Sequence, residues 1–234
     1  MLKKLEWESK ILDVKIANFN YEKLKDNKFE IANKIDNKEI EFIQSTVDIN
    51  DCETINFLEN NGFHFEDLKI SMKMNIHKEW KDYQENYEIA DKNDIKIIKN
   101  IAKELFYYSR FNIFGNEKAK EIYEIWAEKA IYGEFDDVCF KVLDKDNKDI
   151  CGFLTLKKTS NNEARIGIIA VEFSKQNSGY GKKLINSVKK YLAENDINKF
   201  YIVTQGKNIK AQNFYHRVGF FMEKIEMWYY KDLR

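Results

Sequence analysis

A short loop in the second half of the chain has the residue types of a diphosphate-binding turn. Its sequence is Gln176-Asn177-Ser178-Gly179-Tyr180-Gly181. Small residues let main-chain N–H groups point into such a turn, and a helix that follows adds the positive end of its dipole. A Gly-x-Gly pair alone is weak evidence, because many turns contain two glycines for backbone reasons. The interpretation therefore depends on the neighbouring elements.

The elements around this loop are a predicted strand and a predicted helix. The preceding segment, Arg165–Val171, is rich in β-branched residues, which favours a strand. After the loop, apolar residues recur at helical spacing: Leu184, Ile185, Val188, Tyr191 and Leu192. This order puts the loop at the N-terminus of a helix, where main-chain donors are available to an anion.

A second motif, nearer the C-terminus, contains a tyrosine that could donate a proton. Asn208 begins a predicted helix that is closed by Gly219, and a predicted strand, Phe220–Tyr230, follows. Another apolar strand, Phe200–Thr204, precedes it. Tyr215 lies on this helix, and its phenol is a hydrogen-bond donor at neutral pH. The alternative role for Tyr215 is that of an aromatic side chain packed in the core.

The two motifs, taken in this order, resemble the GNAT superfamily of acyl-CoA-dependent N-acyltransferases over about residues 86–234. The resemblance implies an α/β (α+β) GNAT fold, in which helices flank a mixed, mostly antiparallel twisted sheet. It also implies an N-acetyltransferase that takes acetyl-CoA as co-substrate and uses no metal.

The resemblance implies a role for each motif residue. Three consecutive strand residues would pair through their main chain with the pantetheine arm of acetyl-CoA: Ile169, Ala170 and Val171. The N–H groups of Gln176–Gly181 would bind the pyrophosphate, and Asn208 would anchor the cofactor from the other side. Tyr215 would be the general acid that protonates the departing CoA thiolate.

The general base is harder to assign. Glu163 and Glu172 bracket the strand Arg165–Val171, and either could relay a proton through water. Alternation along the strand would decide which face each glutamate points to, but a bulge in this strand, common in the family, changes the count. We keep Glu163 as a substrate-side candidate. His216 lies on a different helix face from Tyr215, so we expect it at the surface.

Four shorter segments are similar to the dTDP-fucosamine acetyltransferases, which acetylate the 4-amino group of a dTDP-linked dideoxy sugar. They are Ser109-Arg110-Phe111, Trp126–Gly133, Ala164–Ala170 and Thr204–Asn208. The implied acceptor is a small-molecule amine, a dTDP-amino sugar. Arg110 is then a candidate substrate contact, since a guanidinium suits phosphate recognition; the alternative is a surface or helix-end salt bridge. Phe214 departs from this subgroup, which can have a basic residue there, so one phosphate contact is in doubt.

The cofactor motifs do not encode the acceptor, so other activities remain open. An acetyltransferase for a protein N-terminus, a lysine, a polyamine or a drug amine would need the same motifs. A binding module that has lost catalysis is the non-enzymatic alternative. The retained site residues argue against that module: Gly179, Gly181, Asn208 and Tyr215.

Composition excludes several classes of protein. The 39 Lys and Arg residues balance 39 Asp and Glu residues, which disfavours binding to nucleic acid. No apolar run is long enough to span a bilayer, and no signal-peptide core follows Met1. We therefore expect a cytoplasmic protein with neither a nucleic-acid nor a membrane partner, and we leave a homodimer open. Cys52, Cys139 and Cys151 lack metal-ligand spacing and are expected to be free, mostly buried thiols.

The chain also resembles itself. Asn56–Phe63 has the spacing of Asn213–Phe220, and each segment lies between two apolar strands. The alternative is coincidence, because a helix closed by Gly-Phe before a strand is common. We interpret residues 1–80 as a smaller, degenerate and partial GNAT-like domain, and residues 81–234 as the catalytic domain. The first copy has Leu58 where the second has Tyr215, so it should not catalyse.

Several elements are predicted between the two copies. The charged stretch His77–Gln84 is the expected linker. Two amphipathic helices are expected around Ile95–Phe106 and Ile122–Ala130, with Gly133 ending the second. A hairpin should then join Val138–Leu143 to Ile150–Leu156.

Overall fold

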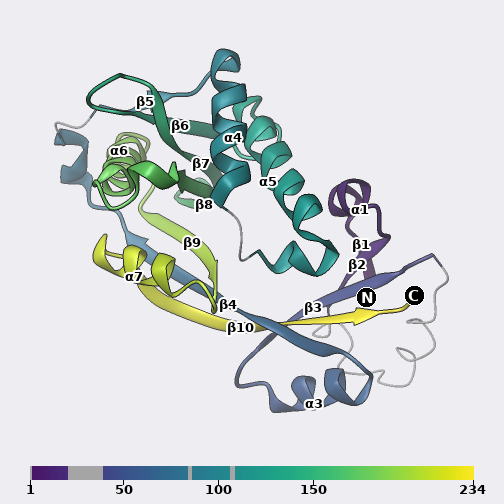
Figure 1. The fold of residues 1–234 in the computed structure, drawn as a ribbon. Coiled ribbons are helices and arrows are strands. Elements are labelled where there is room, and N and C mark those ends of the chain that lie inside the picture. The colour runs from purple at the N-terminus through teal and green to yellow at the C-terminus, as the bar shows by residue number, and fades with distance from the viewer. Residues whose placement is uncertain (1, 21–38, 84–85, 106–108) are drawn as a thin grey trace. The chain divides into compact units, whose positions relative to one another are not determined.

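The computed structural model describes residues 2–20, 39–83, 86–105 and 109–234 (Figure 1). The chain forms two compact units. Unit 1 comprises residues 1–70, 204–208 and 224–234, and unit 2 comprises residues 71–203 and 209–223. The units divide the chain at points other than the boundary that we predicted at residue 80, because segments near the C-terminus belong to unit 1.

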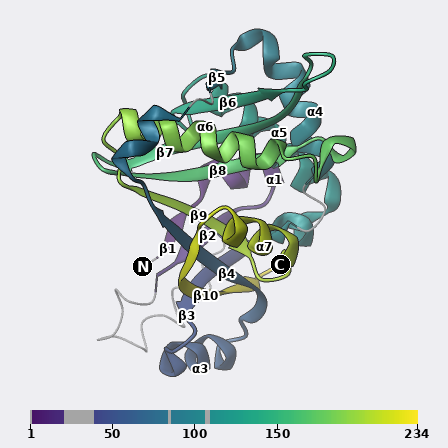
Figure 2. The same ribbon diagram turned by 90° about the vertical axis from the view of Figure 1, so that its left-hand side faces the viewer.

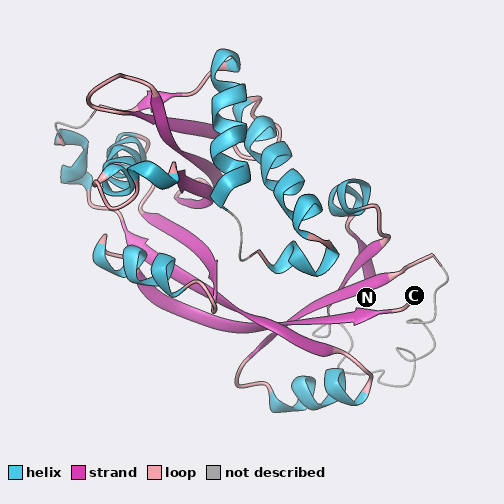
Figure 3. Ribbon diagram, viewed as in Figure 1, coloured by secondary structure: helices cyan, strands magenta, loops and turns pink. Residues whose placement is uncertain are grey.

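Unit 1 is built on a small mixed sheet (Figures 1 and 3). Its elements are β1 (Leu2–Lys4), α1 (Glu6–Leu12), β2 (Ile16–Phe19), β3 (Phe42–Asp48), α3 (Cys52–Asn60), the first part of β4 (His64–Asn75) and the last part of β10 (Phe221–Asp232). Strand β2 pairs antiparallel with β1 and parallel with β3, and β3 pairs antiparallel with β10. Apolar side chains of these elements, among them Ile43, Leu58, Phe63 and Tyr229, form one buried core.

Unit 2 contains the elements of the expected GNAT domain. They are η2 (Lys78–Asp82), β5 (Glu88–Ile89), η3 (Lys92–Asp94), α4 (Ile95–Leu105), η4 (Arg110–Phe114), α5 (Asn116–Ile131), β6 (Val138–Leu143), β7 (Ile150–Ser160), β8 (Glu163–Val171), η5 (Phe173–Lys175), α6 (Tyr180–Glu194), α7 (Ile209–Arg217) and all but the last two residues of β9 (Lys199–Gln205), with the remainders of β4 and β10. Strands β5 to β8 pair antiparallel in sequence order, and β8 pairs parallel with β9. This open, mixed and mostly antiparallel sheet confirms the predicted fold class.

Helices cover both faces of the central strands of unit 2. Helices α4 and α5 lie on one face of β6–β8 and α6 lies on the other (Figures 1 and 2). The seven residues Ile150–Leu156 of β7 are therefore all buried, whichever face their side chains point to. The predicted helices and hairpin are confirmed, except that Phe106 lies outside the described residues. Gly133 ends α5 in a left-handed conformation with φ 71°.

The predicted linker is a packed segment of unit 2 over its described part. It contains η2, and the Nζ of Lys189 on α6 lies 4.8 Å from the centroid of the Trp80 ring. The Nζ of Lys190, also on α6, donates to the carbonyl oxygen of Tyr83 (2.9 Å). Gln84, the last residue of this prediction, lies outside the described residues. Within the part of the chain that is described, none of the helices combines the length and the apolar character needed to cross a membrane.

Candidate active site

Strand β8 has main-chain groups next to the loop that we predicted to bind a diphosphate. It pairs with β7 along most of its length but with β9 only at its start, over Glu163–Arg165. Both strands continue beyond these pairs. The second half of β8 includes Ile169, Ala170 and Val171 and leads directly into the loop. An extended ligand could therefore pair with this edge in the manner of an added strand.

Strand β8 contains the bulge that the resemblance implied. Leu154 pairs with Ile169 and Leu156 pairs with Ile166, so Thr155 alone faces two residues, Gly167 and Ile168. A side chain at Gly167 would overlap the carboxylate of Asp136, and only glycine fits there. The bulge redirects the main chain of β8 just before Ile169.

The loop between β8 and α6 contains two residues in the left-handed region and leads directly into a helix. Asn177 and Gly179 have positive φ values of 61° and 89°, and the 15-residue helix α6 begins at Tyr180. Gly179 faces open space, since a Cβ there would have no heavy atom within 4 Å. The side chain of Gln176 donates to the carbonyl oxygen of Val171 (3.3 Å), and that of Ser178 donates to the carbonyl oxygen of Gln176 (3.4 Å). These bonds fold the loop over the end of β8.

Gly181 leaves room for an aromatic ring of α7. A Cβ on Gly181 would lie 3.1 Å from the Cζ of Phe214 on α7, so the absent side chain makes room for that ring. The assignment of the Gly181 N–H to the pyrophosphate stays a prediction. Gly179, whose side is open, is the glycine at which a ligand could approach the main chain.

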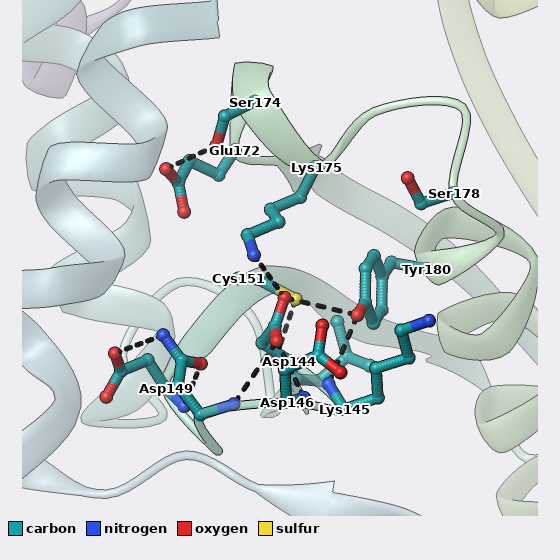
Figure 4. A network of polar contacts seen from close by, with 12 residues as sticks. Asp144, Lys145, Asp146, Asp149, Cys151, Glu172, Ser174, Lys175, Ser178 and Tyr180 are labelled. Atoms are coloured by element: carbon teal, nitrogen blue, oxygen red, sulfur yellow. Dashed lines mark hydrogen bonds and ion pairs between the residues drawn. The ribbon is translucent and has the colours of Figure 1, made fainter.

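An ion pair fixes the loop to the hairpin turn between β6 and β7 (Figure 4). The Nζ of Lys175 lies 2.6 Å from the Oδ2 of Asp144, and the Tyr180 hydroxyl donates to the same carboxylate (3.2 Å). The bond to Lys175, together with main-chain donors such as the N–H of Asp146, holds the pKa of Asp144 well below its usual range. The Lys175 pKa is raised by the same bond.

A cavity of about 450 Å³ opens beside this ion pair. It is lined by Asp144, Lys145, Asp146, Ser174, Lys175, Ser178, Gly179, Tyr180 and Lys183. Lys175 is paired with Asp144 and a second aspartate lies in the lining, so Lys145, Lys183 and the N-terminus of α6 are the groups that could attract an anion here.

Tyr215 is a buried phenol on α7. The residue is 6% exposed, and its ring packs against those of Phe214 and Phe220 at centroid distances of 5.4 and 5.8 Å. Burial raises the pKa of the phenol, so the group stays protonated at neutral pH. No described residue forms a hydrogen bond with the Tyr215 hydroxyl, which leaves its proton available to a ligand.

The remaining predicted residues lie in several places. The guanidinium of Arg110 lies 4.0 Å from the centroid of the Phe111 ring. Glu163 is at the far end of β8 from the loop, where its Oε1 accepts from the Nζ of Lys199 (3.0 Å). His216 is exposed, as expected. Asn208 directly precedes α7 and belongs to unit 1, and its assignment to the cofactor stays a prediction.

The thiols and possible metal ligands show no reactive centre among the described residues. Cys139 and Cys151 are buried and Cys52 is exposed, and all three are free. Burial raises the pKa of Cys151 to about 11, which keeps this thiol protonated and weakly nucleophilic. Within the described ranges, the His, Cys, Asp and Glu side chains form no cluster that could hold a metal ion.

Sequence reasoning missed two polar centres of unit 2. One is the ion pair of Asp144 with Lys175, and the other is the buried carboxylate of Asp136 beside the bulge. Gly167 within a β-branched strand was a usable signal for the bulge, because glycine inside a strand often marks one. The sequence has no comparable signal for the two aspartates, which meet their partners only through tertiary packing.

Comparison with known proteins gives a family match and two curated relatives. Residues 97–220 match the acetyltransferase (GNAT) family. A dTDP-fucosamine acetyltransferase of Escherichia coli O6:H1 strain CFT073 is 26% identical over 145 residues, which are 61% of this chain and 62% of that protein. A streptothricin acetyltransferase of Escherichia coli is 28% identical over 104 residues, 44% of this chain and 54% of that protein. The chain thus spans less than two thirds of the length of either relative.

Solved structures show the same fold. A tandem GNAT protein from the clavulanic acid biosynthesis pathway has a TM-score of 0.62 at 12% identity, covering 93% of this chain and 75% of its own. A GCN5-related N-acetyltransferase from Sphaerobacter thermophilus has a TM-score of 0.58 at 12% identity, covering 82% and 60%. The family match extends over more than half of the chain, from α4 to the end of α7. This chain belongs to the acetyltransferase (GNAT) family.

Proposed function

We propose that this chain transfers the acetyl group of acetyl-CoA to the amino group of a dTDP-linked amino-deoxy sugar. The observation that most supports the chemistry is the Tyr215 phenol, which is buried and has no hydrogen-bond partner among the described residues. It lies in the same unit as the bulged strand β8 and the loop that follows. A group so placed can serve as a general acid, because burial keeps it in the protonated form.

In the proposed reaction, main-chain groups bind acetyl-CoA and a side chain transfers the proton. The main chain of Ile169, Ala170 and Val171 pairs with the pantetheine arm, and the N–H groups of Gln176–Gly181 bind the pyrophosphate. The uncharged amine attacks the thioester carbon, a C–N bond forms and the C–S bond breaks. The amine nitrogen loses one proton to water, and the Tyr215 phenol gives one to the sulfur, so CoA leaves as a neutral thiol. The Tyr215 phenolate then regains a proton from solvent.

The acceptor assignment has two lines of support. One is the similarity to the Escherichia coli dTDP-fucosamine acetyltransferase. The other is a set of aromatic and cationic groups around α5: Arg110 lies over Phe111, and the rings of Tyr123 and Trp126 are stacked at a centroid distance of 6.4 Å. A guanidinium suits a diphosphate. The rings of Phe111 and Tyr123 are buried, at 5% and 8% exposed, so they support this region and do not present a free face to a base. We propose Arg110 as the substrate contact.

A drug amine is the second candidate acceptor. The similarity to a streptothricin acetyltransferase of Escherichia coli supports it, although that match covers a smaller share of the chain. Both candidates use the same acetyl-CoA chemistry and differ only in what the acceptor side of the site binds.

A measurement of CoA release separates the two candidates. The full chain would be given acetyl-CoA and, in turn, dTDP- and UDP-amino sugars, streptothricin, spermidine and a lysine peptide. We expect the highest kcat/KM with a dTDP-amino sugar. A higher value with streptothricin would move the acceptor to the second candidate, and activity with spermidine or the peptide alone would contradict both.

The nucleotide should contribute much of the sugar's binding energy, because it positions the amine without reacting. Free dTDP should compete with the sugar and, at about a hundred times its Kd, raise the free energy of unfolding by roughly 2.7 kcal/mol. Arg110→Ala should reduce this stabilisation while acetyl-CoA binding is largely kept. Arg234→Ala, which changes an arginine of unit 1, is the matched control and should leave the dTDP effect intact. A dTDP effect of the same size in Arg110→Ala would remove Arg110 from the acceptor site.

A further inference from the structure

A fully buried carboxylate lies beside the bulge of β8 in unit 2. Asp136 is 0% exposed and directly precedes Asp137, whose main-chain N–H donates to the carbonyl oxygen of Leu156 on β7 (2.7 Å). A buried charge is costly unless hydrogen bonds compensate it, so a structure that retains one makes specific contacts to it. The contacts of Asp136 come from three elements of unit 2.

The first contacts form a chain of donors that ends on Asp136. The main-chain N–H of Ile168 on β8 donates to the Thr155 hydroxyl oxygen (2.8 Å), and this hydroxyl donates to the Oδ2 of Asp136 (2.6 Å). An ionised carboxylate only accepts, so it fixes the direction of the Thr155 O–H bond. The lone pairs of the hydroxyl are thereby left facing Ile168. The Asp136 carboxylate thus orients the Thr155 hydroxyl so that its oxygen accepts from the Ile168 N–H.

The bond to Ile168 replaces one that the sheet cannot supply. At the bulge two residues of β8 face Thr155 alone, so one of their main-chain groups is left without a ladder partner. A buried N–H without a partner is costly. Gly167, beside Ile168, leaves the space that the Asp136 carboxylate occupies. The bulge therefore depends on the side chains of Thr155 and Asp136 as well as on the backbone.

The other contacts of Asp136 reach the acceptor side of the unit. The indole Nε1 of Trp126 on α5 donates to the Oδ2 (2.8 Å), and the Nη2 of Arg165 lies 3.6 Å from the Oδ1. The Oδ1 accepts no hydrogen bond from the described residues. Trp126 belongs to the aromatic set around α5 to which the proposed function assigns the acceptor. Asp136 therefore joins this helix to the strand that would hold acetyl-CoA.

We infer that Asp136 and Thr155 are positioning residues of the acetyltransferase. The hydrogen bonds from the Ile168 N–H to Thr155 and from Thr155 to Asp136 fix the bulge of β8 and hence the direction of the Ile169–Val171 main chain. The hydrogen bond from Trp126 to Asp136 fixes the position of α5 relative to that main chain. This inference rests on the proposed assignment of Ile169–Val171 to acetyl-CoA. It adds that the hydrogen bonds linking Ile168, Thr155 and Asp136 set the alignment of the thioester and the amine, although the side chains of Thr155 and Asp136 contact neither group.

The test compares Thr155→Val, which keeps the shape but removes the hydroxyl, with Thr155→Ser, which keeps the hydroxyl. A displacement of about 1 Å at the reacting atoms can cost roughly 10²-fold in rate. We expect Thr155→Val to lower kcat by about 10- to 100-fold, while Thr155→Ser stays within about threefold of the wild type. The KM for acetyl-CoA should rise less than kcat falls, because the loop that binds the diphosphate is unchanged.

Thermal melting and amide hydrogen exchange distinguish alignment from loss of fold. The Ile168 amide should exchange faster in Thr155→Val, while amides of α6 keep their wild-type protection. If Thr155→Val does not fold, Trp126→Phe replaces it, since that change removes the indole donor, keeps an aromatic ring at this position and should also lower kcat. Equal kcat values in folded Thr155→Val and Thr155→Ser, or a wild-type kcat in Trp126→Phe, would overturn the inference. Failure of the proposed function is a separate result, in which the wild type itself transfers no acetyl group.

Discussion

Two segments of the molecule share one local structure and differ in their chemistry. Helix α3, in unit 1, leads into β4, and helix α7, in unit 2, leads into β10. Both helices have nine residues, and both strands have twelve. The turn is closed by the same bond in each: Phe63 N–H donates to the Leu58 carbonyl oxygen (3.0 Å), and Phe220 N–H donates to the Tyr215 carbonyl oxygen (2.9 Å).

The glycines of the two turns match as well. Gly62 and Gly219 have positive φ values of 74° and 104°, and each donates its N–H to the helix residue three positions earlier, at 3.1 Å in both cases. Glycine is favoured because other residues rarely adopt this conformation at the end of a helix. The agreement supports our interpretation of the N-terminal region as a degenerate copy, which remains a prediction.

The side chains at equivalent positions account for the difference. Leu58 is fully buried in an apolar core, where it can only pack. Tyr215 is also buried, but it brings a hydroxyl that no described residue engages. The comparison shows that the same arrangement of helix, glycine and strand can pack around a leucine or a tyrosine. Under the proposed function, chemistry requires in addition the phenol and the loop before α6.

The largest expected effect comes from removing the Tyr215 hydroxyl. Tyr215→Phe keeps the ring and its packing, so kcat should fall by roughly 10²–10⁴ while acetyl-CoA affinity is nearly kept. Tyr229→Phe is the matched control, since Tyr229 is a buried tyrosine of unit 1 whose hydroxyl donates to Glu59 (2.8 Å). The control should lower stability and leave kcat unchanged. If Tyr215→Phe kept most of its kcat, the tyrosine would have no part in proton transfer.

The equivalent position in the first copy should affect stability alone. Leu58→Ala removes buried methyl groups and leaves a cavity, so the free energy of unfolding should fall by about 2–5 kcal/mol. Chemical denaturation would measure the loss, and kcat should stay at the wild-type value at temperatures where the variant is folded. A large drop in kcat in the folded variant would mean that the first copy contributes to catalysis.

The two turn glycines should give the smallest and most similar effects. A Cβ at Gly62 would lie 3.9 Å from the Cε of Lys231, and one at Gly219 would lie 3.6 Å from the Cε of Met74, so neither site is crowded. Each change to alanine should therefore cost only the backbone strain of the left-handed conformation, about 1–2 kcal/mol. Thermal melting of both variants tests this. If only one variant lost stability, the two turns would share their geometry but not their energetics.

The sequence was sufficient to predict the elements whose structure is determined by local residue patterns. The strand before the loop, the helix after it and the helix closed by Gly219 were all expected, because hydrophobic periodicity and glycine position determine them locally. The exposed position of His216 followed from helix geometry in the same way. Tyr215 was singled out because it lies in a motif whose order along the chain is distinctive.

Features that depend on long-range packing were not predictable. The side chain of Phe214, 33 positions away in sequence, packs beside Gly181, and no local pattern predicted this contact. The contacts of Asp136 with Trp126 and Thr155 require α5, β7 and β8 to be already assembled. The division into units also depends on C-terminal segments that pack with residues 1–70, and no local signal marks this.

The central claim is that the loop before α6 binds acetyl-CoA, and calorimetric titration tests it most directly. Gly179→Val places a side chain in the open space at a residue with φ 89°, and Gly133→Val makes the same change at another open glycine, with φ 71°. We predict that the wild type and Gly133→Val bind one acetyl-CoA per chain. Gly179→Val should bind at least tenfold more weakly, a loss of about 1.4 kcal/mol. Unchanged affinity in folded Gly179→Val would contradict the account.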